Sequence, residues 1–278
     1  MEGRRDVMAP QNLDELCEAM RGATFVRISG TKTQHSYLPD TDAVELTVSG
    51  IAGIIQHDVA DQVVEVWAGT KVSDLQSELA LHGQCLPLPL DDALPTALSC
   101  ADGTVGGLLA MNMPHALSAQ CGGPREWTLG MTVVRPDGTL AKCGSKVVKS
   151  VAGYDVHKLF VGSRGELGVI AKAALRTFPL KAMPRHEARV HGRATAPLYV
   201  SRSLRTGFEE ALSSAPGLVA DDPRSCTVWQ TSEPPQPLNG WCVGPGGYRS
   251  RSPQPAGLEA KAKAVFDPDS KLAPGWSL

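Results

Sequence analysis

The stretch KVVKSVAGYDVHKLFVGSRGELGVI, residues 146–170, carries four glycines and ends in an apolar run. Its glycine spacing matches neither the dinucleotide fingerprint G-x-G-x-x-G nor the phosphate loop G-x-x-x-x-G-K-[ST]. Because glycine has no Cβ, it lets a ligand or a second segment approach the backbone closely. The apolar run continues as GVIAKAALRTF and predicts a buried strand that begins at Gly168. We interpret the glycines as points of close approach, and we expect a short helix from Asp155 to Phe160 that Asp155 caps.

Apolar segments on either side of this stretch alternate between helix-like and strand-like patterns. Helices are predicted for residues 13–20, after a first-turn Pro10, for residues 72–79, ended by Gly83, and for residues 104–114. Strands are predicted for residues 25–28, 44–48 and 63–67, and a hairpin for residues 127–144, turned by Pro136, Asp137 and Gly138. Strands and helices do not alternate regularly, and no G-x-G-x-x-G follows the first strand, which argues against a doubly wound nicotinamide-binding domain. The predicted fold class is α+β, with two halves joined near residue 60.

Proline is more frequent after residue 180, where it also forms clusters with glycine. Twelve of the 21 prolines lie there, and the clusters SSAPG, EPPQP, GPGG and SPQPAG fall between Ser213 and Gly257. Such clusters interrupt regular elements and favour turns. We therefore predict one domain over residues 1–180 and a partly irregular C-terminal region over residues 181–278, with room for a few short elements.

The overall composition argues against nucleic-acid and membrane partners. The 278 residues are 42% hydrophobic and carry a net charge of -2, which gives a well-buried core and no electrostatic attraction to nucleic acid or an anionic membrane. No apolar run approaches the roughly 20 residues of a transmembrane segment. The start, MEGRRDVMAP, lacks the apolar region of a signal peptide. We expect a cytoplasmic protein, reaching a membrane only through partners.

The seven cysteines do not form a metal-binding pattern. None is paired as C-x-x-C, and their scatter differs from a zinc or iron–sulfur framework. They are Cys17, Cys85, Cys100, Cys121, Cys143, Cys226 and Cys242. We expect buried thiols in a reducing compartment and no metal site, so that any electrons leave through another chain.

The loop SGTKTQHS, residues 29–36, is a candidate anion site directly after the strand FVRI. Its small residues, Ser29, Gly30, Thr31 and Thr33, allow successive backbone N–H groups to face one point, and Lys32 adds a positive charge. An ordinary polar turn would have the same composition. His35 lies in this loop, where a covalent link to a cofactor is conceivable.

Two further glycine pairs mark close approach. In GTVGG, Thr104, Gly106 and Gly107 begin a short helix, where backbone donors suit a phosphate or a ring edge. Tight packing of that helix on a strand explains the same glycines. In CGGPREW, Gly122 and Gly123 form a second pair.

The remaining candidates have everyday structural explanations. The histidines are scattered, and a single histidine is more often a surface or satisfied core residue than a catalytic one. Asp91 and Asp92 are adjacent in an extended segment, so their side chains point in opposite directions. Tyr154 could pack against a ring, or it could be a core tyrosine with a bonded hydroxyl.

The order of these motifs resembles the FAD-binding domain of the vanillyl-alcohol oxidase/p-cresol methylhydroxylase (PCMH-type) superfamily, over residues 20–180. Within it, the closest resemblance is to the E subunit of glycolate oxidase. It is carried by VVEVWAGTKVSDLQSELALHGQCLPL (63–88), GTVGG (103–107), GPREWTLGMTVVRPDGTLAKCG (123–144), VVKSVAGYDVHKLFVGSRGELGVI (147–170) and, in the tail, AVFDPDSKLAPGW (264–276).

The resemblance implies two α+β subdomains that clasp an extended FAD, followed by a shortened C-terminal cap. The loop after the first strand would hold the pyrophosphate, and the glycine segments would line the flavin. The residues implied to bind the cofactor are Ser29, Gly30, Thr31, Lys32, Thr33, Pro87, Thr104, Gly106, Gly107, Gly122, Gly123, Gly165, Gly168, Val169 and Ile170. No catalytic residue is carried over, because the cap that supplies one in relatives is short here.

The chain departs from the family pattern at two polar positions. Ser150 and Ala273 stand where the family usually has asparagine, which puts a polar contact near the flavin in doubt. The resemblance implies a FAD-binding subunit of a glycolate or other 2-hydroxy-acid dehydrogenase, in a hetero-oligomer with another flavoprotein subunit and an iron–sulfur subunit. The alternative is a non-catalytic FAD-binding or assembly subunit docked on a catalytic paralogue.

Overall fold

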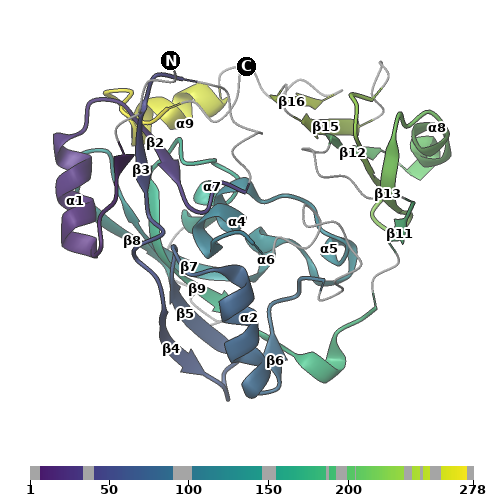
Figure 1. Ribbon diagram of the computed structural model, residues 1–278, viewed down its shortest axis with the longest axis horizontal. Coiled ribbons are helices and arrows are strands. Elements are labelled where there is room, and N and C mark those ends of the chain that lie inside the picture. The colour runs from purple at the N-terminus through teal and green to yellow at the C-terminus, as the bar shows by residue number, and fades with distance from the viewer. Residues whose placement is uncertain are drawn as a thin grey trace.

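A small parallel sheet forms the N-terminal part of the molecule (Figure 1). The computed structural model describes residues 7–33, 41–89, 102–145, 155–185, 188–191, 199–203, 205–234, 240–244, 247–250 and 258–273. Strands β1 (Val7–Met8), β3 (Val44–Thr47) and β2 (Val26–Ser29) pair in that order, all parallel. Helix α1 (Leu13–Gly22) packs its apolar stripe on this sheet.

Helix α1 begins at Leu13, as predicted, but Pro10 does not have the predicted role in its first turn. Its N-cap is Asn12, whose side-chain oxygen accepts a hydrogen bond from the backbone N–H of Glu15 at 3.0 Å. Pro10 lies two residues before this cap and is not in the first turn. The asparagine supplies an acceptor for a free N–H of the first turn, which a proline cannot do, so the cap determines where the helix begins.

A five-stranded antiparallel sheet follows, in the order β4-β5-β9-β7-β8. Its strands are β4 (Ile54–Asp58), β5 (Val63–Trp67), β9 (Val169–Arg176), β7 (Thr128–Val134) and β8 (Leu140–Gly144). The apolar run after the quoted glycines is the central strand β9, paired on both sides and buried along almost its whole length. The predicted hairpin is confirmed as the β7–β8 pair. Since β4 and β5 belong to one sheet, the two halves meet between β3 and β4, earlier than the predicted residue 60.

Helices cover one face of this sheet and build the main core. They are α2 (Val72–Leu81), α4 (Val105–Met111), α5 (Ser118–Cys121), α6 (Pro124–Trp127) and α7 (His157–Phe160). Leu75, Leu79, Leu109, Trp127 and Phe160 are buried together with the inner residues of β5, β7 and β9. A short antiparallel pair, β6 (Gln84–Cys85) with β10 (Phe178–Pro179), extends this layer and leads to the 3-10 turn Leu180–Ala182.

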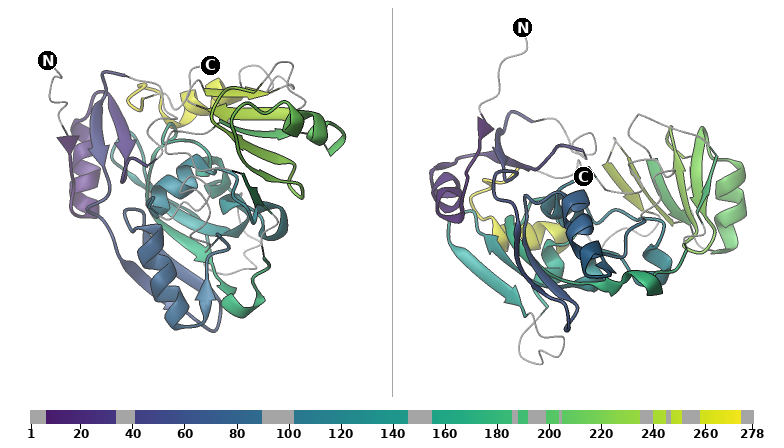
Figure 2. Two further views of the ribbon diagram at one scale, coloured as in Figure 1. Left: turned by 45° about the vertical axis from the view of Figure 1, so that its right-hand side comes forward. Right: turned by 60° about the horizontal axis from the view of Figure 1, so that its bottom comes forward.

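The C-terminal region is more regular than the sequence predicts. It forms a six-stranded antiparallel sheet in the order β11-β13-β14-β12-β15-β16, and α8 (Phe208–Ser213), after the turn Arg205–Gly207, covers the face turned away from the other sheets (Figure 2). The strands are β11 (Arg189–Val190), β12 (Tyr199–Ser203), β13 (Leu218–Asp222), β14 (Thr227–Gln230), β15 (Gly240–Gly244) and β16 (Gly247–Ser250). Each strand is short enough to fit between the prolines and glycines, of which Pro216, Gly217 and Pro223 lie in connections.

The last segment of the chain returns to the first sheet. Helix α9 (Leu258–Phe266) packs its Phe266 ring against Phe160 of α7, and Leu272 forms a parallel bridge with Val26 of β2. Residues 258–273 therefore pack with the predicted first domain, although they lie far beyond its predicted end at residue 180. Among the described helices, none is both long and apolar enough to cross a bilayer.

Candidate functional site

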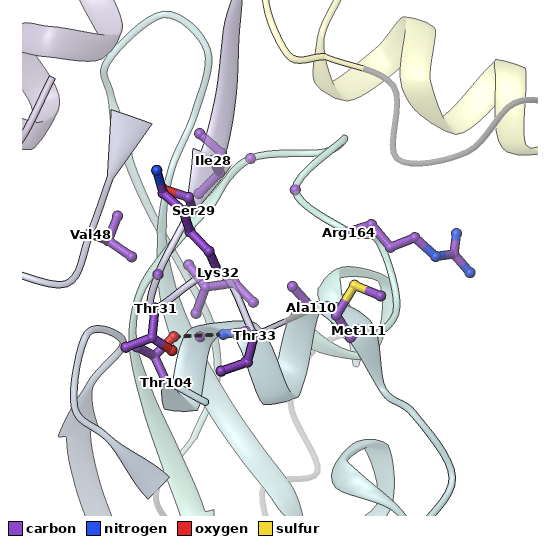
Figure 3. Close-up of a pocket in the computed structure, with 16 residues that line it drawn as sticks. Ile28, Ser29, Thr31, Lys32, Thr33, Val48, Thr104, Ala110, Met111 and Arg164 are labelled. Carbon is purple, nitrogen blue, oxygen red and sulfur yellow. Dashed lines mark hydrogen bonds between the residues drawn. The ribbon is translucent and has the colours of Figure 1, made fainter. Parts of the chain in front are cut away.

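A pocket opens where three segments of the chain meet (Figure 3). One wall is the end of β2 with the loop after it, the second is α4, and the third is the loop before β9. The pocket holds about 670 Å³ of empty space, part of it open to solvent. Its lining is Ile28, Ser29, Gly30, Thr31, Lys32, Thr33, Val48, Thr104, Gly106, Gly107, Ala110, Met111, Arg164, Gly165, Gly168 and Ile170.

The first wall is held by a buried carboxylate on β3. Glu45 accepts a hydrogen bond from the Ser29 hydroxyl at 2.6 Å and forms an ion pair with the Lys32 ammonium at 2.7 Å. Lys32 reaches it from a left-handed backbone conformation, with φ of 63°. The Thr31 hydroxyl is also engaged, donating to the carbonyl of Asp102 at 2.8 Å. The charge that the sequence assigns to an anion therefore already has a carboxylate partner.

The second wall begins with the N-cap of α4. Thr104 caps it by accepting from the backbone N–H of Gly107 at 3.2 Å, and the N–H of Gly106 donates to the carbonyl of Ala68 at 2.8 Å. These donors, expected to face a ligand, are used inside the protein. A Cβ on Gly106 would lie 2.9 Å from the Cβ of Ala68, and one on Gly30 only 2.3 Å from the Thr104 hydroxyl oxygen. The glycines therefore allow the loop, the helix and β5 to pack closely.

The third wall is tied to the other two. The N–H of Arg164 donates to the carbonyl of Ala110 at 2.9 Å, which fixes the loop against α4. Gly165 has φ of 84°, and a Cβ there would contact the side chain of Ile28 at 3.4 Å. A Cβ on Gly168 would lie 3.2 Å from the ring of Phe160. Both glycines have positive φ values that other residues rarely adopt, and at Gly168 a side chain would also crowd Phe160.

The structure brings eleven of the fifteen predicted residues to this pocket. The other four lie elsewhere: Pro87 is buried just after β6, Gly122 and Gly123 separate α5 from α6, and Val169 points into the core from β9. Gly123 is nevertheless close to the end of α4, because a Cβ there would lie 3.6 Å from the Asn112 side-chain oxygen.

Five pocket residues were missed from the sequence: Ile28, Val48, Ala110, Met111 and Arg164. Ala110 and Met111 follow Gly106 and Gly107 by four residues, so the helical period could have found them. Ile28 lies on β2 and Val48 directly follows the parallel strand β3, so only the register of these two strands brings them to one pocket.

The helix cap predicted for Asp155 is wrong. Helix α7 has Val156 at its N-cap position and no side-chain cap bond. The Asp155 carboxylate instead pairs with the ammonium of Lys158 at 2.9 Å, and this hydrogen bond and charge hold the pKa of Asp155 below its usual value. The N–H of Lys158 in the first turn of α7 donates to the backbone carbonyl of Asp155 at 2.9 Å, so the carboxylate is not the acceptor there. His35, Asp91, Asp92, Cys100, Ser150 and Tyr154 lie outside the described residues.

Among the described histidines, His115 and His157 are buried, His57 is half-buried, and His82 and His191 are exposed. His57 bonds the side-chain oxygen of Gln84 at 2.9 Å. Four cysteine thiols are buried and two are partly buried, and all six are free, as predicted: Cys17, Cys85, Cys226 and Cys242, then Cys121 and Cys143. Burial raises the pKa of Cys85 and of Cys143 to about 11, so neither is a thiolate near neutral pH.

His115, after the end of α4, is fully buried. Its Nδ1 accepts from the backbone N–H of Leu117 at 3.3 Å, while Nε2 is buried without a hydrogen-bond partner among the described residues. Burial, with a smaller contribution from the charge of Arg202 on β12, lowers the pKa of His115 to about 4. The imidazole is therefore neutral at pH 7, and Arg202 lies near enough to affect it.

A family model described as an FAD binding domain matches residues 5–144 of this chain. That range contains the first two walls of the pocket, the loop after β2 and helix α4. The third wall, before β9, lies beyond it.

Curated relatives match over about 60% of the chain. The chain is 28% identical over 179 residues to glycolate oxidase subunit GlcD of Bacillus subtilis, covering 62% of this chain and 37% of the relative. It is 27% identical over 167 residues to glycolate oxidase subunit GlcE of Escherichia coli, covering 60% and 46%. It is 34% identical over 186 residues to a mitochondrial D-lactate dehydrogenase of Arabidopsis thaliana, covering 65% and 31%. The matched chain spans less than half of each of these relatives.

A solved structure of alkyldihydroxyacetonephosphate synthase has the same fold. It superposes with a TM-score of 0.52 at 16% identity, covering 75% of this chain and 36% of the other. At this identity the likeness concerns the fold alone.

Proposed function

The chain belongs to the FAD binding domain family whose model matches residues 5–144, and from this premise we propose that the three-walled pocket holds FAD as the redox cofactor of a 2-hydroxy-acid oxidoreductase. The observation that carries the proposal is the pocket itself. Glycines allow close approach on each wall, and the interior is mostly apolar. Such a lining suits a flat ring and an extended nucleotide, whose polar parts then lie toward the open side.

The chain would bind and orient the cofactor through its three walls. When bound, FAD supplies the acceptor for a hydride equivalent from the α-carbon of the substrate. The apolar side chains of Ile28, Val48 and Met111 would exclude water from the ring. Lys32 and Arg164 are the ionisable residues of the described lining; in Figure 3 the Arg164 side chain extends away from the loop that carries Lys32.

The preferred substrate class is a small 2-hydroxy acid, glycolate first. This substrate class is supported by the similarity of the chain to glycolate oxidase subunits and to D-lactate dehydrogenases. The similarity extends over at most 65% of this chain. The proposed partners are another flavoprotein subunit and an iron–sulfur subunit that takes the electrons. The described residues contain no group of three or more His, Cys, Asp or Glu side chains placed to hold a metal ion.

A second candidate function is a FAD-binding or assembly subunit that does no chemistry of its own. One observation favours it: no aspartate, glutamate or histidine occurs in the described lining of the pocket. The substrate hydroxyl needs a group to take its proton. That group would then come from outside the described lining, or from a partner chain docked beside the pocket.

The test is to purify the chain with and without bound partners. Released flavin is identified, apoprotein is titrated with FAD, and glycolate, D-lactate, L-lactate and 2-hydroxyglutarate are screened with an artificial electron acceptor. One FAD per chain with turnover supports the leading proposal. One FAD per chain with turnover only when the partner is present supports the assembly role, and failure to bind any FAD contradicts both.

A further inference from the structure

The C-terminal segment contacts two walls of the cofactor pocket, although it is far from both in sequence. Residues 271–273 run beside β2, whose last residues line the pocket. The N–H of Val26 donates to the carbonyl of Lys271, and the N–H of Ala273 donates to the carbonyl of Val26, both at 2.7 Å. The tail therefore pairs with β2 two residues before the pocket begins at Ile28.

The same segment also reaches the loop before β9. The Lys263 ammonium on α9 donates to the carbonyl of Glu166 at 3.0 Å, in the middle of that loop. Gly165 and Gly168, on either side of Glu166, line the pocket. The ring of Phe266 packs edge-on against Phe160, with 5.4 Å between centroids, and Phe160 in turn lies against Gly168.

A single lysine joins these contacts. Besides Glu166, its ammonium bonds the carbonyl of Leu272 at 2.9 Å and the carboxylate of Asp267 at 2.5 Å. Asp267 is almost completely buried and also accepts from the N–H groups of Lys271 and Leu272, each at 2.9 Å. Each of the three N–H donors of the Lys263 ammonium therefore has an acceptor, and one of these acceptors is a carboxylate that balances its charge.

We infer that residues 258–273 form a clasp that holds the β2 wall and the Glu166 wall at a fixed separation, with Lys263 as its positioning residue. The inference rests on the proposed placement of FAD in the pocket. Since FAD contacts both walls, docking of the clasp and binding of FAD stabilise each other. This coupling is reciprocal: whatever factor the clasp adds to FAD affinity, FAD adds to docking of the clasp.

The first test compares Lys263→Met with Lys261→Met in the full chain. Lys261 lies on the same helix with an exposed side chain, so its variant controls for loss of charge. We expect FAD to bind about tenfold more weakly to Lys263→Met, as loss of a charge-assisted hydrogen bond implies, with a shifted visible absorption band of the bound flavin. Lys261→Met keeps the wild-type dissociation constant and spectrum.

A general loss of stability is separated from positioning by a third variant. Val228→Ala removes buried side-chain volume from the C-terminal sheet, in a hydrophobic cluster that contains no residue of the clasp. It lowers the unfolding temperature without weakening FAD binding. The two variants are compared at the same decrease in unfolding temperature. If Val228→Ala then weakens FAD binding as much as Lys263→Met does, the inference is wrong.

The second test uses the unmodified chain, so it does not depend on a variant that folds. Trypsin cleavage after Lys271 requires the tail to leave β2, whereas Lys181 is exposed in a turn. We expect saturating FAD to slow cleavage after Lys271 about fivefold or more, within the usual range of coupling between sites, and to leave cleavage after Lys181 unchanged.

The outcomes distinguish this inference from the proposal on which it rests. If FAD binds the chain but leaves cleavage after Lys271 unchanged, the FAD proposal stands and the clasp is refuted. If FAD does not bind at all, the FAD proposal itself fails.

Discussion

Gly30 is the residue at which the geometry of the pocket is tightest. A Cβ there would lie 2.3 Å from the Thr104 hydroxyl oxygen, which caps α4. We expect Gly30→Ala to displace Thr104, to lower the free energy of unfolding by about 1 kcal/mol, the usual value of an N-cap, and to weaken FAD binding about tenfold. Chemical denaturation and an FAD titration by flavin fluorescence measure the two effects.

Gly22→Ala is the matched control for this substitution. No atom lies within 4 Å of a Cβ at Gly22, which ends α1. Its variant should be neutral or slightly stabilising, because alanine favours a helix over glycine, and FAD affinity should not change. Equal FAD affinity in the Gly30 and Gly22 variants would place the cofactor away from this loop.

Because Lys32 forms an ion pair with Glu45, replacing both residues can distinguish two roles of Lys32 in FAD binding. If the lysine mainly offsets the charge of Glu45, Lys32→Ala removes one positive charge beside that carboxylate and weakens binding of the FAD phosphates several-fold. Glu45→Gln in the same chain removes the charge of the carboxylate and restores affinity. Isothermal titration of both variants and the double variant measures the coupling. Affinity that stays low in the double variant would mean that Lys32 contacts the phosphates directly.

His115 predicts a loss of stability in mild acid. The folded chain holds its pKa at about 4, whereas an unfolded histidine titrates near 6.5, so below that pH the unfolded state binds the proton first. Stability is complete above about pH 6.5 and falls until about pH 4, by roughly 2 kcal/mol between pH 8 and pH 5. Denaturant unfolding across this range measures it.

The His115→Gln variant isolates this contribution. Burial also lowers the pKa of His157, so part of the pH dependence remains when His115 is replaced. We expect the loss of stability between pH 8 and pH 5 to shrink markedly in the variant. An identical pH profile in wild type and variant would mean that His115 titrates normally in the folded chain.

Site residues could be predicted from the sequence when they belong to a short continuous motif. The loop Ser29–Thr33, the pair Gly106 and Gly107, and the glycines before β9 each stand out in the sequence. The partner of Lys32 does not stand out in the sequence. Glu45 is 13 residues away on β3, and only the parallel register of β2 with β3 brings it close to the loop that carries Lys32. Whether a charge is free for a ligand is therefore decided by packing, which a local pattern does not contain.

At the level of elements, the β7–β8 hairpin gives a prediction independent of the pocket. Gly138 in its turn has φ of 77°, and a Cβ would lie 2.5 Å from the carbonyl oxygen of Cys17 on α1. We expect Gly138→Ala to lower the free energy of unfolding by about 1–3 kcal/mol, combining backbone strain with overpacking, and to leave FAD affinity unchanged. Denaturant unfolding and FAD titration test both statements.

Gly83→Ala controls for the backbone strain. Gly83 has a similar φ of 67°, but a Cβ added there would have no atom within 4 Å. The excess destabilisation of Gly138→Ala over Gly83→Ala measures the contact between the hairpin turn and α1. Equal destabilisation of the two variants would contradict that contact.

Elements with a strong local signal were predicted well, and those set by context were not. The turn residues of 136–138 and the apolar period of 72–79 determine β7–β8 and α2. The C-terminal sheet was underestimated because strands of two to five residues leave little periodic signal, and their pairing connects residues far apart in the chain. Helix α1 was predicted to begin at the right residue, but the prediction assigned its first turn to Pro10 and overlooked the capping residue Asn12.

For the whole molecule, the sequence did not predict that the end of the chain packs against β2. Proline and glycine content marked a change near residue 180, but nothing local shows that residues 258–273 pack against a strand that begins at Val26. The order of motifs did predict the family and its α+β fold, because that order reflects the whole chain. The fold of the cofactor domain was therefore predictable, and the position of the tail was not.

The most direct test of the pocket is hydrogen exchange of the whole chain with and without saturating FAD. We expect protection in peptides covering residues 28–33, 104–111 and 164–170, the three walls, and no change in α8 or in the β7–β8 turn. Protection confined to other parts of the chain, with these three segments unchanged, would contradict FAD binding in this pocket.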